Sequence, residues 1–330
     1  SSDLADFTYP MGDLNLAVGA EWREEQYTKY QGQKEAWMAG PWALVHTLTY
    51  DSAGTGTMVN YGYTAPGLAA NGMPGTSPDA AGAFARQNTG YYVDAEYDLD
   101  ALLVQAAFRM EDFSDFGTTT NYKVAGRYSL GNLATFRGGY STGFRAPTPG
   151  QSNYSGVTTS FDGVTGMQVN EGTLKPTHPL CVALGGAALE PETATNLSAG
   201  FTTSMVSGLN LSVDYYQIDL KAKIIKSRSL PVEGSTEFSE LAFYTNALDT
   251  KTSGIDVVAT YSLGNTNVGL AVNTNETSVE AQNQVGGQNP VSDGTVFNLE
   301  NNLPKMRMTA SVTQSFSDAL SLMARVNHYG

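Results

Sequence analysis

Hydrophobic and polar residues alternate with a period of two in many segments of the chain. Leu209, Leu211 and Val213 alternate with Asn210 and Ser212, for example. This alternation predicts β-strands with one apolar and one polar face, because successive side chains of a strand point to opposite sides. The pattern predicts about eleven strands, at 14–22, 91–99, 102–110, 122–128, 134–140, 197–201, 209–215, 255–263, 268–272, 306–312 and 320–326. Their richness in Tyr, Val, Thr, Phe and Gly favours strands over helices.

The predicted connections alternate between short turns and long loops. Compact turns with suitable residues lie at Asp100, 131–132, 206–208, 264–265 and 317–318. The long connections run through 28–88, 113–120, 143–192, 222–250 and 281–302. Turns at one end and long loops at the other are typical of transmembrane barrels, in which the turns face the periplasm and the loops face outward. Some soluble folds also gather their loops at one end.

The composition fits a wall that meets lipid. Hydrophobic residues make up 41% of the 330 residues and charged residues 15%, against roughly 25% charged residues in an average soluble domain. No apolar run approaches the roughly 20 residues of a membrane helix, so the chain either crosses a membrane as strands or is soluble. An open sheet in lipid would leave two edges with unpaired backbone groups. We therefore expect further strands to close a barrel of about 22 strands, which is wide enough to need a plug.

Charge and cysteine content narrow the possible partners. The net charge of −14 argues against nucleic acid, whose phosphates need a basic surface. Acidic loops explain the excess of carboxylates. Cys181 is the single cysteine, so we expect an unpaired loop thiol, or a disulfide with a cysteine outside this segment.

Several segments together resemble the barrel of TonB-dependent receptors. Residues 133–151 read LATFRGGYSTGFRAPTPGQ, similar to the strand and GFRAP-type corner of that family. Further similar segments follow in the family's order at 189–201, 210–220, 252–256, 303–307 and 325–330, and 17–25 is similar to an early strand. Ser198 stands where the family usually has an acidic residue. Each segment alone is a weak signal, whereas the ordered set covers most of the chain apart from the long loops.

The resemblance implies an outer-membrane receptor of a Gram-negative bacterium, a multi-pass β-barrel that imports a scarce nutrient such as an iron–siderophore complex. Its partners would be a small-molecule ligand such as an iron chelate, outer-membrane lipid, and the TonB complex, reached through a plug with a TonB box. We expect residues 1–330 to form one barrel domain without a plug. The first residues show no secretory signal and the last are not a typical closing strand. We therefore expect missing sequence on both sides.

The candidate site residues come from the polar faces and the long loops. Arg109, Glu111, Arg127 and Arg137 alternate away from the apolar positions, so they should face the lumen and a plug. Arg145 ends a strand before Pro147, and it either pairs with a carboxylate or contacts ligand. Further candidate ligand-binding residues are Trp37, Trp42 and Tyr154, since aromatic side chains in outward loops can stack on a ligand or pack the loop against itself.

No enzyme or cofactor signature accompanies these residues. His178 and Cys181 have a metal-like spacing but no further partners. No nucleophile elbow, phosphate-binding loop or zinc-protease motif is present, so we expect no catalytic residues, no metal and no cofactor. The alternatives to an active importer are a passive porin or channel and a surface binding protein with a receptor-like barrel.

Overall fold

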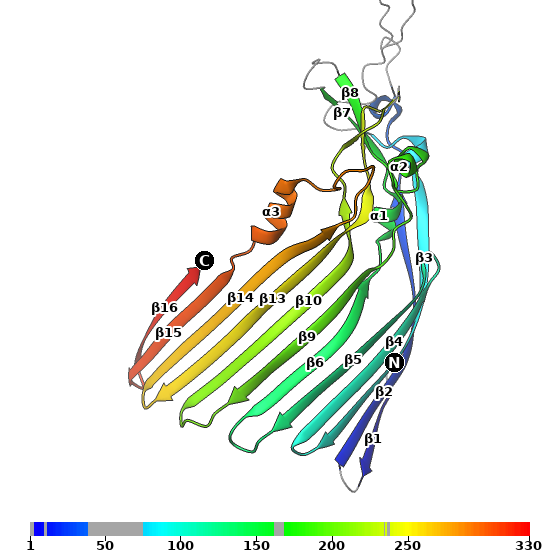
Figure 1. The fold of residues 1–330 in the computed structure, drawn as a ribbon. Coiled ribbons are helices and arrows are strands. Elements are labelled where there is room, and N and C mark those ends of the chain that lie inside the picture. Colours follow the sequence, from blue (N-terminus) through cyan, green and yellow to red (C-terminus); the bar gives the residue numbers. More distant parts are fainter. Residues whose placement is uncertain (1–2, 10–11, 39–74, 162–167, 234, 236–237) are drawn as a thin grey trace, which may run out of the picture.

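A single antiparallel sheet dominates the computed structural model, which describes residues 3–9, 12–38, 75–161, 168–233, 235 and 238–330. In this part of the chain twelve strands pair in an up-and-down order along a tilted, curved wall (Figure 1). The twelve strands are β1 (Asp3–Tyr9), β2 (Gly12–Lys29), β3 (Gly82–Leu99), β4 (Leu102–Phe113), β5 (Gly117–Ser129), β6 (Thr135–Arg145), β9 (Glu192–Thr203), β10 (Leu209–Lys226), β13 (Tyr244–Leu263), β14 (Thr266–Gln282), β15 (Met306–Ser317) and β16 (Leu320–Tyr329). The wall is the partial transmembrane-type barrel that the alternation predicts.

Tight turns join the strands at the lower end of the wall in Figure 1. Asp100, between β3 and β4, has a φ of 60°. Glycines with φ between 54° and 81° occupy three other turns, Gly131, Gly208 and Gly264. Positive φ is the backbone conformation in which glycine carries no Cβ penalty. The turn residues therefore set the short connections at this end.

The sheet has an apolar face on which no second layer packs among the residues that the structure describes. Val18, Val93, Phe108 and Tyr122 lie opposite one another on β2 to β5. Their side chains are 39–48% exposed. A soluble sheet would bury such a row against a second layer. Exposed apolar rows are instead typical of a wall whose solvent on that side is lipid.

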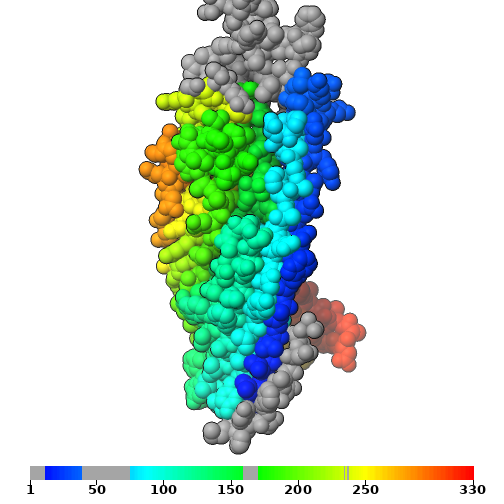
Figure 2. Space-filling model, turned by 90° about the vertical axis from the view of Figure 1, so that its right-hand side faces the viewer, coloured from blue at the N-terminus to red at the C-terminus, as the bar shows by residue number. Residues whose placement is uncertain are grey.

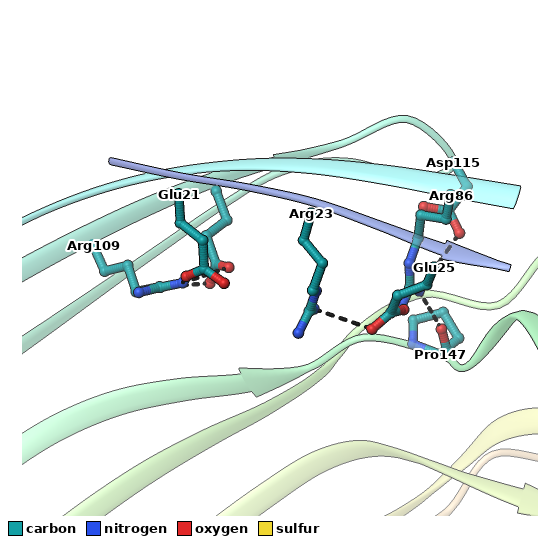
Figure 3. Close-up of polar contacts among 8 residues, drawn as sticks. Glu21, Arg23, Glu25, Arg86, Arg109, Asp115 and Pro147 are labelled. Carbon is teal, nitrogen blue, oxygen red and sulfur yellow. Dashed lines mark hydrogen bonds and ion pairs between the residues drawn. The ribbon is translucent and has the colours of Figure 1, made fainter. Parts of the chain in front are cut away.

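The opposite face is polar. Arg127, Arg137, Gly200 and Asp214 share one row across β5, β6, β9 and β10. Figure 3 shows Glu21 and its neighbours projecting from β2 toward the strands on the far side of the curve, so the polar face is the concave one. The two faces therefore follow directly from the period-two pattern.

The structure differs from the sequence prediction in three respects. β1 is an additional strand that the alternation did not predict. Several strands are longer than predicted, since β2, β3, β10 and β13 reach 18 to 20 residues. Their outer parts carry polar residues on both faces, so the alternation fades there although the pairing continues. The predicted long loop at 113–120 is wrong, because β5 begins at Gly117 and only three residues separate it from β4.

Four short strands and most helical turns lie in the long connections at the upper end. The second sheet has the order β11 (Leu230–Pro231), β12 (Glu240–Ala242), β8 (Gln168–Thr173) and β7 (Gly156–Phe161). The helices are η1 (Lys34–Ala36), η2 (Pro78–Ala80), α1 (Pro149–Asn153), α2 (Pro179–Ala183) and α3 (Asp293–Asn301). Figure 2 shows the green residues between β6 and β9 beside the upper part of β3, in cyan.

A few apolar residues near the outer strand ends of the wall, such as Phe113 and Leu248, are buried, but the buried hydrophobic cluster of the described residues belongs to these connections. It combines residues from three segments, namely Leu174, Cys181, Leu230, Phe238, Leu241, Phe243 and Val285. Phe243, Leu241 and Cys181 are fully buried. Because burial of apolar surface from water is the main driving force for such a cluster, the long connections form a compact module of their own at the outer end.

Candidate functional site

Arg109 on β4 lies between two carboxylates on the polar face. Its guanidinium is 3.0 Å from Glu21 and 3.0 Å from Glu111, and it lies over the ring of Tyr92 at 5.8 Å from the centroid. The Glu111 side chain is only 9% exposed, so the neighbouring arginine compensates a carboxylate that is largely removed from water. The group joins β2, β3 and β4, and Figure 3 shows Glu21 of β2 beside Arg109 of β4.

Arg86 on β3 connects more segments than the other arginines of the polar face. It forms an ion pair with Glu25 of β2 and lies 3.7 Å from Asp115 in the β4–β5 turn. It also donates to the main-chain oxygen of Pro147 at 2.5 Å and lies over the Phe113 ring at 5.3 Å. Figure 3 shows Glu25, Asp115 and Pro147 converging on it. A buried guanidinium with this many partners positions the chain segments that supply them.

Two further arginines on the polar face also have carboxylate partners. Arg137 reaches across β9 to Asp214, with distances of 2.7 Å and 2.5 Å to the two carboxylate oxygens. Arg127 lies 3.8 Å from Asp98. Gly200 lies between Arg137 and Asp214 in the row, and its lack of a side chain leaves room for the contact.

The four residues predicted to face the lumen, Arg109, Glu111, Arg127 and Arg137, all lie on this concave polar face. The structure brings Arg109 and Glu111 together and places Arg127 and Arg137 opposite each other on β5 and β6. Each has an oppositely charged partner within the wall. That they contact a plug stays a prediction.

Arg145 ends β6 in a pair with Glu192, the first residue of β9. Its Nε lies 2.8 Å from one carboxylate oxygen of Glu192, and its Nη2 bonds the other. The Glu192 side chain is 5% exposed, and it also accepts a hydrogen bond of 2.7 Å from the main-chain N–H of Ile224. Of the two roles considered for Arg145, the geometry presents the carboxylate pair, and contact with a ligand stays a prediction.

Two adjoining pockets lie among the outer connections. One has a volume of about 540 Å³ and includes Trp37 in its lining, and the other has about 380 Å³ and includes Lys29 and Tyr154. Their linings share Gly75, Thr76, Gly156 and Val157. The structure thus brings two of the predicted ligand-binding residues to neighbouring pockets, while Arg145 lines neither. Trp42 lies outside the described residues.

Lys29 and Lys226 line the smaller pocket, and sequence reasoning did not single them out. Lys29 ends β2 and Lys226 ends β10, so 197 residues separate two side chains that meet at one cavity. The only sequence signal is that each lysine stands at the outer end of an alternating segment. That signal cannot show which strand ends share a pocket.

The Cys181 thiol lies in the outer core, and the single cysteine is free. Burial raises the pKa of Cys181 to about 11, because the thiolate would lose its hydration there. His178 begins α2, and its Nδ1 accepts a hydrogen bond from the N–H of Leu180. Among the described residues no group of three or more His, Cys, Asp or Glu side chains could hold a metal ion.

No helix in the described part of the chain is both long and apolar enough to span a membrane.

The family described as "TonB dependent receptor-like, beta-barrel" matches residues 4–329. A search of curated proteins found no match.

Solved structures of siderophore receptors share the fold. The siderophore receptor PirA from Acinetobacter baumannii matches with a TM-score of 0.60 at 16% identity, over 100% of this chain and 41% of that one. A mutant ferric enterobactin receptor, PfeA, from Pseudomonas aeruginosa in complex with enterobactin matches with a TM-score of 0.64 at 14% identity, over 100% of this chain and 40% of that one. The FrpB iron transporter from Neisseria meningitidis matches with a TM-score of 0.56 at 11% identity, over 97% and 41%. The chain therefore spans about two fifths of the length of these structures.

Proposed function

The chain belongs to the TonB-dependent receptor β-barrel family, and from this premise we propose that it is the ligand-binding wall of an active importer. In this proposal the barrel lies in the outer membrane of a Gram-negative bacterium and binds a scarce small molecule on its outer side. Import is driven by the TonB complex through a plug that lies outside these 330 residues. The rest of the receptor supplies the strands that close the barrel.

The observation that carries the proposal is the family match over residues 4–329 together with a wall of two opposite faces. The apolar rows suit lipid, because charge there would cost roughly 2–4 kcal/mol per residue at mid-membrane. The concave face is lined by matched charges, such as the Arg137–Asp214 pair. Such a face suits a water-filled or plugged interior.

An iron chelate is the ligand that we propose, because structures with the same fold include receptors for siderophores and for ferric enterobactin. Two pockets with aromatic and charged linings at the outer end, one with Trp37 and one with Tyr154, offer surfaces for such a molecule. Aromatic rings supply large contact areas at a small cost in conformational entropy.

Uptake of ferric enterobactin into cells tests the proposal. The complete gene is deleted, restored as wild type, and compared under iron limitation with and without an uncoupler of the proton-motive force. We expect iron to accumulate only in restored, energised cells. Accumulation that survives the uncoupler would indicate a passive channel, and binding without accumulation would indicate a surface binding protein. Either outcome would overturn active import.

A further inference from the structure

The smaller outer pocket gathers polar groups from five separate segments. Its lining includes Lys29 of β2, Tyr154 after α1, Glu171 of β8 and Lys226 of β10. Hydroxyl groups of Thr76, Thr158, Thr173 and Ser229 complete the polar lining. The pocket measures about 380 Å³, which is within the usual range for small-molecule sites.

Lys29 is a partly buried cation for which the described residues supply no anionic partner. Its ammonium group donates to the main-chain oxygen of Ser155 and lies 4.5 Å from the centre of the Tyr154 ring. No ion pair within 4.0 Å joins it to a carboxylate among the residues that the structure describes. Arg86, Arg109 and Arg137 of the concave face, in contrast, each form an ion pair with a carboxylate. A carbonyl and a ring face leave the positive charge of Lys29 uncompensated.

The charge balance of the pocket is opposite to that of the chain. Lys29 and Lys226 contribute two positive charges and Glu171 one negative charge, in a chain with a net charge of −14. None of these three groups forms an ion pair within the described part of the protein. A locally positive concavity in an otherwise acidic molecule attracts negatively charged ligands, because low-dielectric walls focus the field.

We propose that the pocket between Lys29, Tyr154 and Lys226 binds an anionic oxygen group of the imported ligand, such as a carboxylate, phosphate or phenolate. This inference rests on the proposed function and names the chemical group that this part of the receptor recognises. The ligand supplies the counter-charge that Lys29 lacks. The Tyr154 ring fixes the position of the Lys29 side chain, so that the ammonium group is held in place before the ligand arrives.

A cysteine placed in the lining measures the preference for anions directly. Ser229→Cys is made in the complete receptor, with any cysteine elsewhere replaced by serine and the buried Cys181 kept. The exposed thiol is then allowed to react with two probes of equal size, sulfonatoethyl and trimethylammonioethyl methanethiosulfonate. The ratio of the two rate constants reports the local charge.

We expect the sulfonate reagent to react faster than the ammonium reagent. Lys29→Gln should lower the ratio of the sulfonate rate constant to the ammonium rate constant roughly tenfold, because a nearby lysine attracts the anionic probe and repels the cationic one. Lys29→Arg keeps the charge and should keep the ratio. Lys251→Gln removes one positive charge from β13, outside the pocket lining, and is the matched control. Added citrate should slow the reaction with Lys29 present but not with Lys29→Gln.

A faster cationic probe, or an unchanged ratio in Lys29→Gln, would overturn the inference. Folding of every variant is checked by its heat-modifiable mobility on a gel, and the Lys29→Arg variant separates loss of charge from loss of structure. The uptake experiment above is independent of this ratio. A receptor that imports iron but shows no anion preference would keep the proposed function and remove the anion site alone.

Discussion

The guanidinium of Arg86 donates a 2.5 Å hydrogen bond to the main-chain oxygen of Pro147, 61 residues further along the chain. β4 and β5 lie between the strand that carries Arg86 and the strand that precedes Pro147. The segment after Pro147 then runs through α1, whose Thr148 side chain and Gln151 form a capping box. It ends where Ser155 accepts from Lys29. The segment that carries Tyr154 is therefore held at both ends.

Arg86→Gln should lower stability by roughly 2 kcal/mol, since it removes a buried guanidinium and its hydrogen bond to Pro147. It should also increase proteolytic cleavage within 148–155. Denaturant unfolding in lipid vesicles and limited proteolysis measure the two effects. Arg23→Gln is the control: Arg23 pairs with the same Glu25 at 3.3 Å but is exposed, so the cost should stay below about 1 kcal/mol. Equal effects of the two variants would contradict the role given to Arg86.

Arg145→Gln should destabilise the β6–β9 junction by about 2 kcal/mol, because a buried carboxylate loses its cation while half of the arginine side chain is exposed. Of the hydrogen bonds that Glu192 accepts within the described part of the chain, the one from Ile224 would remain. Arg127→Gln serves for comparison, since the Arg127–Asp98 pair is exposed on both sides and 3.8 Å long; it should cost below about 1 kcal/mol. Denaturant titration measures both, and a larger loss for Arg127→Gln would refute the expectation.

Ala222 interrupts β10 with a φ of 55°. Its N–H donates to Asp249 and its carbonyl accepts from Asn246. These two hydrogen bonds to β13 hold both backbone groups of Ala222 in this conformation. Ala222→Gly should stabilise the protein by up to about 1 kcal/mol, whereas Ala222→Val should destabilise it by more than that. Ala106→Gly on β4 is the opposite case and should cost roughly 0.5–1 kcal/mol. The denaturant midpoints of unfolding distinguish the two sites. A lower midpoint for both Ala222→Gly and Ala106→Gly would contradict backbone strain at Ala222.

The stability of the outer module should depend on pH through Cys181. The folded protein holds the thiol with a pKa of about 11, against 9.0 for an exposed thiol. Below pH 9 both states keep the proton, so stability is unchanged; between about 9 and 11 only the unfolded state releases it, so stability falls as pH rises. Cys181→Ala should remove this dependence. Reaction with a thiol reagent at pH 8 should also require unfolding of the module, and rapid labelling of the folded protein would contradict burial.

A charged side chain should destabilise the protein much more at one position of β4 than at the adjacent position. Phe108 lies on the apolar face and Ala107 on the concave one. Phe108→Arg should cost roughly 2–4 kcal/mol in a bilayer, whereas Ala107→Arg should cost much less. Refolding yield into vesicles, read from gel mobility, compares them. Similar losses at both positions would mean that the apolar face does not meet lipid.

Period-two alternation was sufficient to predict the wall and its two faces, because a strand in a single-layer sheet exposes every second residue to one solvent. The additional strand β1 escaped because Leu4 shares its alternate positions with Asp6, and Phe7 shares its own with Asp3, so neither set is uniformly apolar or polar. The predicted strands stop short of the outer ends for a similar reason: β2 continues beyond its predicted end, and β3 and β13 begin before their predicted starts. Above the lipid both faces meet water, so residues such as Glu24 and Glu25 no longer alternate in polarity although they still pair with β3.

The candidate site was predicted less completely. The polar positions of Arg109 and Arg137 followed from the alternation, but their partners Glu21 and Asp214 did not. These pairs span 88 and 77 residues, and only the register of the assembled sheet brings them together. Lys29 was missed because its environment is made by the segment around Ser155, 126 residues away.

The outer core draws Leu174, Leu230 and Val285 from three different connections. Ligand preference in such a receptor therefore cannot be transplanted one loop at a time. A graft of the β10–β13 connection alone would separate Leu230 and Phe243 from Leu174, Cys181 and Val285, with which they form the buried cluster. All three connections have to be transferred together, along with the ends of the strands that they join.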